Sequence, residues 1–194
     1  MEIKKQKPVG LLMLNVGAGK GKTTAAMGTA LRAAGTGMNV YIIQFIKGEW
    51  PSGERDLFQA YEEMRVGYKG GKKLGRVDFV QGGKGFIKIL GDKKPFAVHQ
   101  KAATDTLKKA KQAMKSGKYD LIVMDEAISA VEEKLLKVKD LLEVAKARPK
   151  QVHVIMTGHV APKALAAKAD MVSDIKMVKH PYYKGILAQK GIDF

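Results

Sequence analysis

The feature that most constrains this chain is a glycine-rich segment, residues 15–24, between an apolar run and a stretch of small residues. The apolar run, residues 10–14, predicts a buried strand, and the small residues of 25–31 predict a helix. Glycines allow positive φ and let backbone N–H groups converge on phosphate oxygens. A helix that begins near Lys22 adds free N–H donors and the positive end of its dipole. The segment therefore predicts a phosphate-binding loop.

Eight consecutive residues of this loop are candidates for a nucleotide site. The ammonium of Lys22 can reach phosphate oxygens, and the hydroxyl of Thr23 can ligate Mg²⁺. The loop departs from the pattern G-x-x-x-x-G-K-[ST] because Val16 stands where the first glycine is expected. With a strand before it and a helix after it, we prefer a phosphate loop to a chance glycine-lysine turn. The candidates are Gly17, Ala18, Gly19, Lys20, Gly21, Lys22, Thr23 and Thr24.

Strands and helices alternate along the rest of the chain. The patterns predict strands over 10–16, 39–46, 77–80, 119–126, 152–156 and 171–178, and helices over 22–35, 54–64, 97–116, 131–147 and 161–168. The glycine- and lysine-rich stretches 65–76 and 81–95 are expected as loops. Such alternation predicts a three-layer α/β domain of the P-loop NTPase (RecA-like) type. In it a mostly parallel sheet binds its ligand at the carboxyl ends of the strands.

The length of 194 residues and the absence of a linker predict a single nucleotide-binding domain over 1–194, with 1–9 as a flexible N-terminal arm. No apolar run approaches the roughly 20 residues that span a bilayer. There are no cysteines, which excludes disulfides and thiolate metal sites. We therefore expect a cytoplasmic protein without a membrane partner.

Two acids end the apolar strand predicted over 119–126. Asp125 and Glu126 should reach the same sheet edge as Thr23, where a carboxylate can hold Mg²⁺ directly or through water. Alone, two acids after a strand more often cap a helix. Together with the loop they predict a magnesium–nucleotide site, with Thr23, Asp125 and Glu126 as metal candidates and Lys22, Thr23 and Glu126 as catalytic candidates. Binding a nucleotide does not by itself name the reaction.

The chain is strongly basic, with a net charge of +16. Such a charge attracts polyanions, among them nucleoside triphosphates, nucleic acids and anionic membranes. The lysines are spread over most segments, and the densest run, residues 69–76, lacks the interleaved aromatic residues of a base-stacking platform. We attribute most of the charge to solubility and do not favour nucleic acid as the partner.

Longer motifs add a specific resemblance. They are Phe45-Ile46-Lys47-Gly48-Glu49-Trp50-Pro51-Ser52-Gly53-Glu54, the helix stop Arg148-Pro149, the segment Val178-Lys179-His180-Pro181 and the C-terminal Ala188-Gln189-Lys190-Gly191-Ile192-Asp193-Phe194. With the glycine-lysine loop and Asp125-Glu126, they make the chain resemble the P-loop type ATP:corrinoid adenosyltransferases. Those enzymes adenosylate cob(I)alamin and cob(I)yrinic acid a,c-diamide. The resemblance extends from Gly10 to Phe194.

The resemblance implies a reaction in which cobalt(I) of a reduced corrinoid attacks the 5′ carbon of ATP and triphosphate leaves. It implies Mg²⁺, a flavoprotein reductant and a homodimer. Lys20 and Thr24 would assist Lys22 and Thr23 at the phosphates. The resemblance also implies further contacts to nucleotide or corrinoid from Phe86, Lys179 and Gln189, whereas Trp50 either contacts the ligand or is a packing anchor.

Three positions depart from the family pattern. Ala18 replaces an Asn or Asp of the phosphate loop, Lys88 stands where Trp is common, and His159 replaces a common Arg. The Lys88 departure puts in doubt how a loop around Phe86 would cover the corrinoid. Two other functions stay open at this point. One is a RecA-like ATPase that binds nucleic acid and releases phosphate, and the other is a non-catalytic carrier of corrinoid and nucleotide.

Overall fold

The computed structural model describes residues 9–48, 52–71, 73–85, 87 and 92–193. Within them the chain forms one six-stranded sheet in the order β3-β2-β4-β5-β1-β6, and every neighbouring pair of strands is parallel. The strands are β1 (Leu12–Val16), β2 (Val40–Gln44), β3 (Val77–Gln81), β4 (Leu121–Asp125), β5 (His153–Thr157) and β6 (Met171–Asp174). The predicted α/β fold with a parallel sheet is confirmed.

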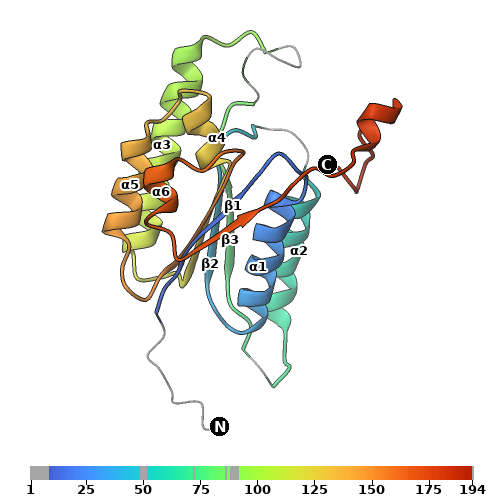
Figure 1. Cartoon of the computed structure of the whole chain (residues 1–194). Coiled ribbons are helices and arrows are strands. Elements are labelled where there is room, and N and C mark those ends of the chain that lie inside the picture. The colour runs from blue at the N-terminus through green and yellow to red at the C-terminus, as the bar shows by residue number, and fades with distance from the viewer. Residues whose placement is uncertain (1–8, 49–51, 72, 86, 88–91, 194) are drawn as a thin grey trace, which may run out of the picture.

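Helices cover both faces of the sheet (Figure 1). Helices α1 (Lys22–Gly35) and α2 (Gly53–Gly67) lie on one face. The other face carries α3 (Phe96–Lys115), α4 (Ala127–Glu132), α5 (Val138–Ala147) and α6 (Lys163–Ala166). A short 3₁₀ helix, η1 (Pro181–Lys184), lies in the C-terminal segment and was not predicted.

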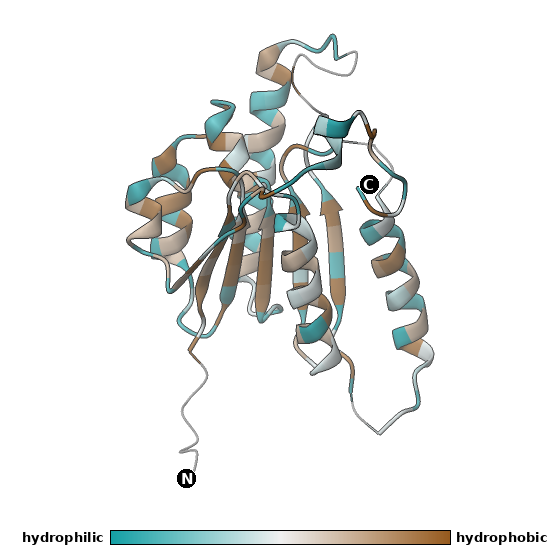
Figure 2. Cartoon of the chain, turned by 45° about the vertical axis from the view of Figure 1, so that its right-hand side comes forward, coloured by the Kyte–Doolittle hydropathy of each residue, from teal (hydrophilic) through white to brown (hydrophobic). Residues whose placement is uncertain are grey.

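Alternation along each buried strand builds two separate cores. On β4, Ile122 and Met124 pack with α3, α4 and α5, whereas Val123 packs with α1 and α2. Successive side chains of a strand point to opposite faces, so a strand covered on both sides must be apolar throughout. Figure 2 shows this as brown strands between helices of mixed colour. Within the described part of the chain, no helix has both the length and the apolar character needed to cross a membrane.

Most predicted elements are present with small shifts of their ends. The helix predicted over 22–35 is confirmed by α1. Helix α2 extends to Gly67, so the loop predicted to begin at 65 begins later. Strand β6 ends at Asp174 rather than near 178. The predicted N-terminal arm lies outside the described residues except at Val9.

The single helix predicted over 131–147 is wrong, because the chain forms α4 and α5 instead. Lys134 adopts a left-handed conformation with φ of 60°. The N–H of Lys134 donates to the carbonyl of Val131 at 3.0 Å, and the N–H of Leu135 donates to the carbonyl of Ala130 at 2.9 Å. This bond pattern is a Schellman motif, which ends a helix. Burial of Leu135 and Leu136 in the core outweighs the helical pattern of the local sequence.

The left-handed position of Lys134 gives a stability prediction. Lys134→Gly should raise the free energy of unfolding by about 0.5–1 kcal/mol, because glycine adopts positive φ without the steric cost of a Cβ. The matched control is Lys137→Gly in the same connection, where φ is −105° and glycine should destabilise. Urea denaturation of the three proteins measures both effects. A loss of stability in Lys134→Gly would contradict the prediction.

Candidate nucleotide site

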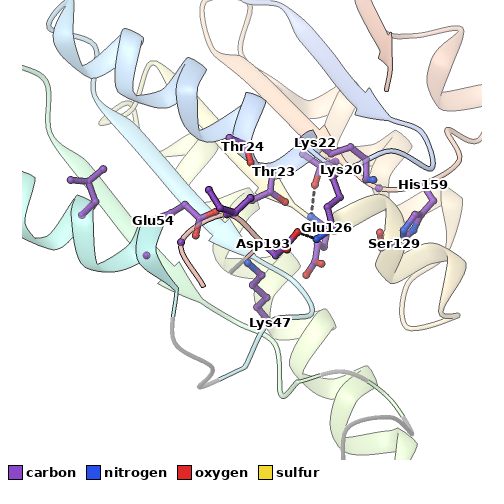
Figure 3. Close-up of a pocket in the computed structure, with 17 residues that line it drawn as sticks. Lys20, Lys22, Thr23, Thr24, Lys47, Glu54, Glu126, Ser129, His159 and Asp193 are labelled. Atoms are coloured by element: carbon purple, nitrogen blue, oxygen red, sulfur yellow. Dashed lines mark hydrogen bonds and ion pairs between the residues drawn. The ribbon is translucent and has the colours of Figure 1, made fainter. Parts of the chain in front are cut away.

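A pocket of about 510 Å³ opens at the carboxyl edge of the sheet (Figure 3). It lies where the phosphate loop, the ends of β4 and β5 and the start of α2 meet the C-terminal segment. Its lining residues are Lys20, Gly21, Lys22, Thr23, Thr24, Lys47, Gly53, Glu54, Leu57, Glu126, Ser129, Thr157, Gly158, His159, Gly191, Ile192 and Asp193. The sheet thus brings together the loop and the acid that the sequence had placed about a hundred residues apart.

The glycines of the phosphate loop serve two different purposes. Gly21 caps α1 with φ of 109°, and nothing lies within 4 Å of a Cβ placed on it, so the backbone conformation is what requires glycine there. At Gly17 and Gly19 a Cβ would lie 2.3 and 2.7 Å from the carbonyl oxygen of Ile175, and Gly17 also has a positive φ, of 115°. The N–H of Gly17 donates to His159 O at 2.7 Å, and the N–H of Gly19 donates to Ile175 O at 2.8 Å. Gly17 and Gly19 therefore seat the loop on the protein, whereas the first N–H groups of a helix such as α1 have no acceptor within the helix and can bind an anion.

The side chain of Lys22 is hydrogen-bonded back to the phosphate loop. Its Nζ donates to the carbonyl oxygen of Gly19 at 2.7 Å. Burial lowers the pKa of Lys22, an effect partly offset by the negative charges of Glu132, Glu126 and Asp125. An ammonium that is partly desolvated at a helix N-terminus interacts strongly with a polyphosphate.

Asp125 is fully buried and accepts three hydrogen bonds. Its Oδ1 accepts from the hydroxyls of Thr23 at 2.9 Å and Thr157 at 2.8 Å, and its Oδ2 accepts from the side-chain amide of Gln44 at 2.9 Å. Thr157 Oγ1 also accepts from the N–H of Glu126 at 2.7 Å. Because Thr23 donates its proton to Asp125, the lone pairs of its hydroxyl are left for a cation. The network fixes the first turn of α1 against the ends of β2, β4 and β5.

Glu126 is the second acid of the site and is strained. It lies just past β4 with φ of 60°, and its Oε2 is buried with no hydrogen-bond partner among the described residues. Burial raises the pKa of Glu126 to about 7, and the charge of Asp125 adds to this rise, whereas Lys47 and Lys22 oppose it. A buried carboxylate with one unpartnered oxygen, next to a second carboxylate that accepts from the Thr23 hydroxyl, fits Mg²⁺, which prefers oxygen ligands and keeps several waters.

The raised pKa of Glu126 predicts how stability changes with pH. The folded protein binds this proton more tightly than the unfolded chain, so the free energy of unfolding should fall as pH rises from about 4.5 to about 7. Glu126→Gln removes that loss, so the variant should be the more stable protein at pH 8, by up to about 3 kcal/mol, and the gap should shrink toward pH 5. Urea denaturation at pH 5 to 8 without divalent cations measures it. Parallel profiles for the two proteins would contradict the prediction.

The structure adds residues that the sequence analysis had not selected. Gln44 and Thr157 each end a buried strand in a polar side chain, which is the same signal that selected Asp125. Lys47 and Glu54 line the pocket from the segment that follows β2. His159, which stands where the family commonly has Arg, also lines the pocket. Its Nδ1 lies 3.1 Å from Oε2 of Glu132.

The remaining predicted site residues either lie outside the described residues or do not line the pocket. Trp50, Phe86 and the departure Lys88 lie outside the described residues. Ala18 is exposed at the tip of the loop. Lys179 and Gln189, both exposed, are not among the described residues that line the pocket, although the N–H of Gln189 donates to Asp193 Oδ2 at 2.7 Å.

Comparison with known proteins identifies the family of the chain. A sequence model of the family described as ATP:corrinoid adenosyltransferase BtuR/CobO/CobP matches residues 8–194. The Corrinoid adenosyltransferase of Escherichia coli (strain K12) is 34% identical over 185 residues, which cover 95% of this chain and 86% of that protein. Corrinoid adenosyltransferase CobA of Salmonella typhimurium is 33% identical over 189 residues, covering 97% and 88%. The Corrinoid adenosyltransferase of Pseudomonas aeruginosa is 34% identical over 185 residues, covering 95% and 84%.

Proposed function

Because the chain belongs to the family of ATP:corrinoid adenosyltransferases BtuR/CobO/CobP, we propose that its pocket transfers the 5′-deoxyadenosyl group of ATP to cobalt and releases triphosphate. The protein is a transferase with ATP and a corrinoid as substrates. The observation that carries the proposal is the phosphate loop at the start of α1, which opens on the pocket beside the Thr23–Asp125 pair. The cobalt acceptor is cob(I)alamin or cob(I)yrinic acid a,c-diamide.

The protein's contribution is to stabilise the leaving group. The cobalt(I) electron pair forms the Co–C bond at the 5′ carbon while the C–O bond breaks, and its electrons pass to the triphosphate. The start of α1, Lys20 and Lys22 supply positive charge where that negative charge grows. No side chain has to act as nucleophile, because the corrinoid supplies the attacking atom.

Magnesium fits the same arrangement. We propose that Thr23 holds it through the hydroxyl, with Asp125 or Glu126 as the carboxylate, directly or through water. Mg²⁺ supplies charge neutralisation at the triphosphate oxygens. Thr24 assists at the phosphates, and Trp50, Phe86, Lys179 and Gln189 remain proposed contacts to nucleotide or corrinoid.

The decisive experiment is an anaerobic incubation of the protein with Mg-ATP, a chemical reductant and either corrinoid. We expect the absorption change of Co–C bond formation and one triphosphate for each corrinoid adenosylated. Release of phosphate stimulated by DNA or RNA would instead select the nucleic-acid-dependent ATPase. Corrinoid binding with unchanged ATP would select the carrier.

We also propose that a flavoprotein with an acidic surface delivers the electron, because the net charge of +16 favours such a partner. Turnover driven by such a reductant should then fall as ionic strength rises, whereas turnover with a small chemical reductant should change little. Steady-state rates over a salt series measure this. A flat response with the flavoprotein would reject the electrostatic role.

The assembly and location are proposals of the same kind. We propose a homodimer, which the exposed Met171 and Val172 on the edge strand β6 support, because such side chains favour association. Sedimentation equilibrium tests it. We propose the cytoplasm as the location, because ATP is supplied there and because a chain without cysteines needs no oxidising compartment to form disulfides.

A further inference from the structure

The C-terminal segment carries a carboxylate into the phosphate-binding end of the pocket. Asp193 forms an ion pair with the ammonium of Lys20 on the phosphate loop. The side chain of Asp193 is only 10% exposed, whereas that of Lys20 is 52% exposed. Gly191 and Ile192 line the pocket next to it, and Figure 3 shows Asp193 among the side chains that face the cavity. A protein anion therefore lies beside a cation of the loop.

A small turn sets the position of this carboxylate. The N–H of Gln189 donates to Asp193 Oδ2 at 2.7 Å, and the N–H of Asp193 donates back to Gln189 O at 2.8 Å. Gly191 allows the turn through its φ of 80°. Because the turn uses Oδ2 of Asp193, Oδ1 is the oxygen that pairs with the ammonium of Lys20. The geometry is that of a preformed anionic group, not of a freely moving chain end.

We propose that Asp193 competes with the triphosphate of ATP for Lys20. The C-terminal segment then occupies part of the phosphate site in the free enzyme and is displaced when the nucleotide binds. This inference rests on the proposed function, because it needs the pocket to receive a triphosphate. One ammonium cannot serve both anions at full strength, since pairing with Asp193 neutralises the charge that would attract phosphate.

The segment is easily displaced. Ile192 is 85% exposed, so moving the turn away uncovers little additional apolar surface. The pair with Lys20 is partly exposed on the lysine side, where ion pairs are weak. The cost of displacing Asp193 is therefore small enough for a polyphosphate to overcome. Its return to Lys20 also helps triphosphate to leave after the reaction.

The test is isothermal titration of the full-length protein with inorganic tripolyphosphate without metal, and then with Mg-ATP. The variants are Asp193→Asn, Lys20→Met and the double variant. Asp193→Asn should tighten tripolyphosphate binding about fivefold, which corresponds to about 1 kcal/mol. In the Lys20→Met background the same change should have no effect, because the competed group is gone. Asp105→Asn on α3 is the matched control, since Asp105 also pairs with a lysine, Lys101 at 2.6 Å, and lies outside the pocket.

Each alternative outcome overturns the inference in a recognisable way. Unchanged or weaker tripolyphosphate binding by Asp193→Asn would show that Asp193 does not compete. Equal tightening by Asp105→Asn, or equal tightening in the Lys20→Met background, would show an effect of net charge alone. Weaker binding of Mg-ATP together with unchanged tripolyphosphate binding would make Asp193 a partner of the metal instead. If the wild-type protein bound neither ligand, the proposed function would fail together with the inference.

Discussion

Lys22→Met should lower kcat/KM for ATP by about a hundred- to a thousandfold, the effect typical of removing one group that stabilises developing negative charge. Methionine keeps the length and the apolar stem of the side chain and removes only the ammonium. Lys22 is hydrogen-bonded across the loop to Gly19 O and borders the pocket, so its ammonium is held at a fixed point beside the proposed triphosphate. Steady-state kinetics with a chemical reductant measure the loss.

The fold should survive this change. Burial lowers the pKa of Lys22, so the free protein gains little from its charge and the melting temperature should change little. Lys111→Met is the matched control, because Lys111 lies on α3 and pairs with Glu143 at 2.9 Å. That variant should keep the kcat/KM of the wild type. Near-normal kcat/KM in Lys22→Met would remove the triphosphate from the proposed position.

Asp125→Ala should lower the free energy of unfolding by about 2–4 kcal/mol, because it leaves buried donors without an acceptor. Three side chains lose their partner at once, those of Thr23, Thr157 and Gln44. The start of α1 then loses its link to β4, and adenosyl transfer should fall by at least about a hundredfold because the phosphate loop is no longer held in place. Urea denaturation and kinetics on the same preparation measure both effects.

Asp125→Asn removes the negative charge of residue 125 and keeps the size of its side chain, so it tests the charge apart from the hydrogen-bond network. Oε1 of Gln44 is buried without a hydrogen-bond partner in the described structure, so rotation of the Gln44 amide would let it accept from an asparagine. The free energy of unfolding of this variant should stay within about 1 kcal/mol of the wild-type value. Its adenosyl transfer, in contrast, should no longer depend on Mg²⁺. Asp120→Ala is the control from the opposite end of β4, where an exposed carboxylate accepts from Asn39 N at 2.8 Å. A stable and fully active Asp125→Ala would show that the network is dispensable.

The elements that were predicted well are those with a strong local signal. Helix α1 was predicted with its observed ends, because glycines stand on both sides of a run of alanine, threonine and methionine. Strand β4 is apolar up to its last residue, which is the acid Asp125. This pattern is typical of a buried parallel strand that leads to a site. Asp125 and the phosphate loop were paired on this reasoning alone, and the structure places Thr23 Oγ1 2.9 Å from Asp125 Oδ1.

The elements that were missed depend on contacts that are distant in sequence. The break between α4 and α5 occurs at a lysine rather than a glycine, and it is fixed by the burial of Leu135 and Leu136. Gly17 and Gly19 were predicted to bind phosphate, and the structure adds a separate requirement for glycine, because a Cβ at either position would lie 2.3 or 2.7 Å from the carbonyl oxygen of Ile175, about 155 residues away along the chain. No local pattern contains that information.

The sequence by itself determined the strand–loop–helix unit, the parallel sheet and the acid that partners the loop. Each of these follows from periodicity or from glycine within a few residues. Only the tertiary structure decided that Gln44 and Thr157 complete the Asp125 network, and that Asp193 reaches Lys20 from the other end of the chain. The physical reason is the strand order, which places β2 and β5 on either side of β4 and brings their carboxyl ends to one edge. Hydrogen bonds and charges act over a few ångströms of space, whatever the distance along the chain.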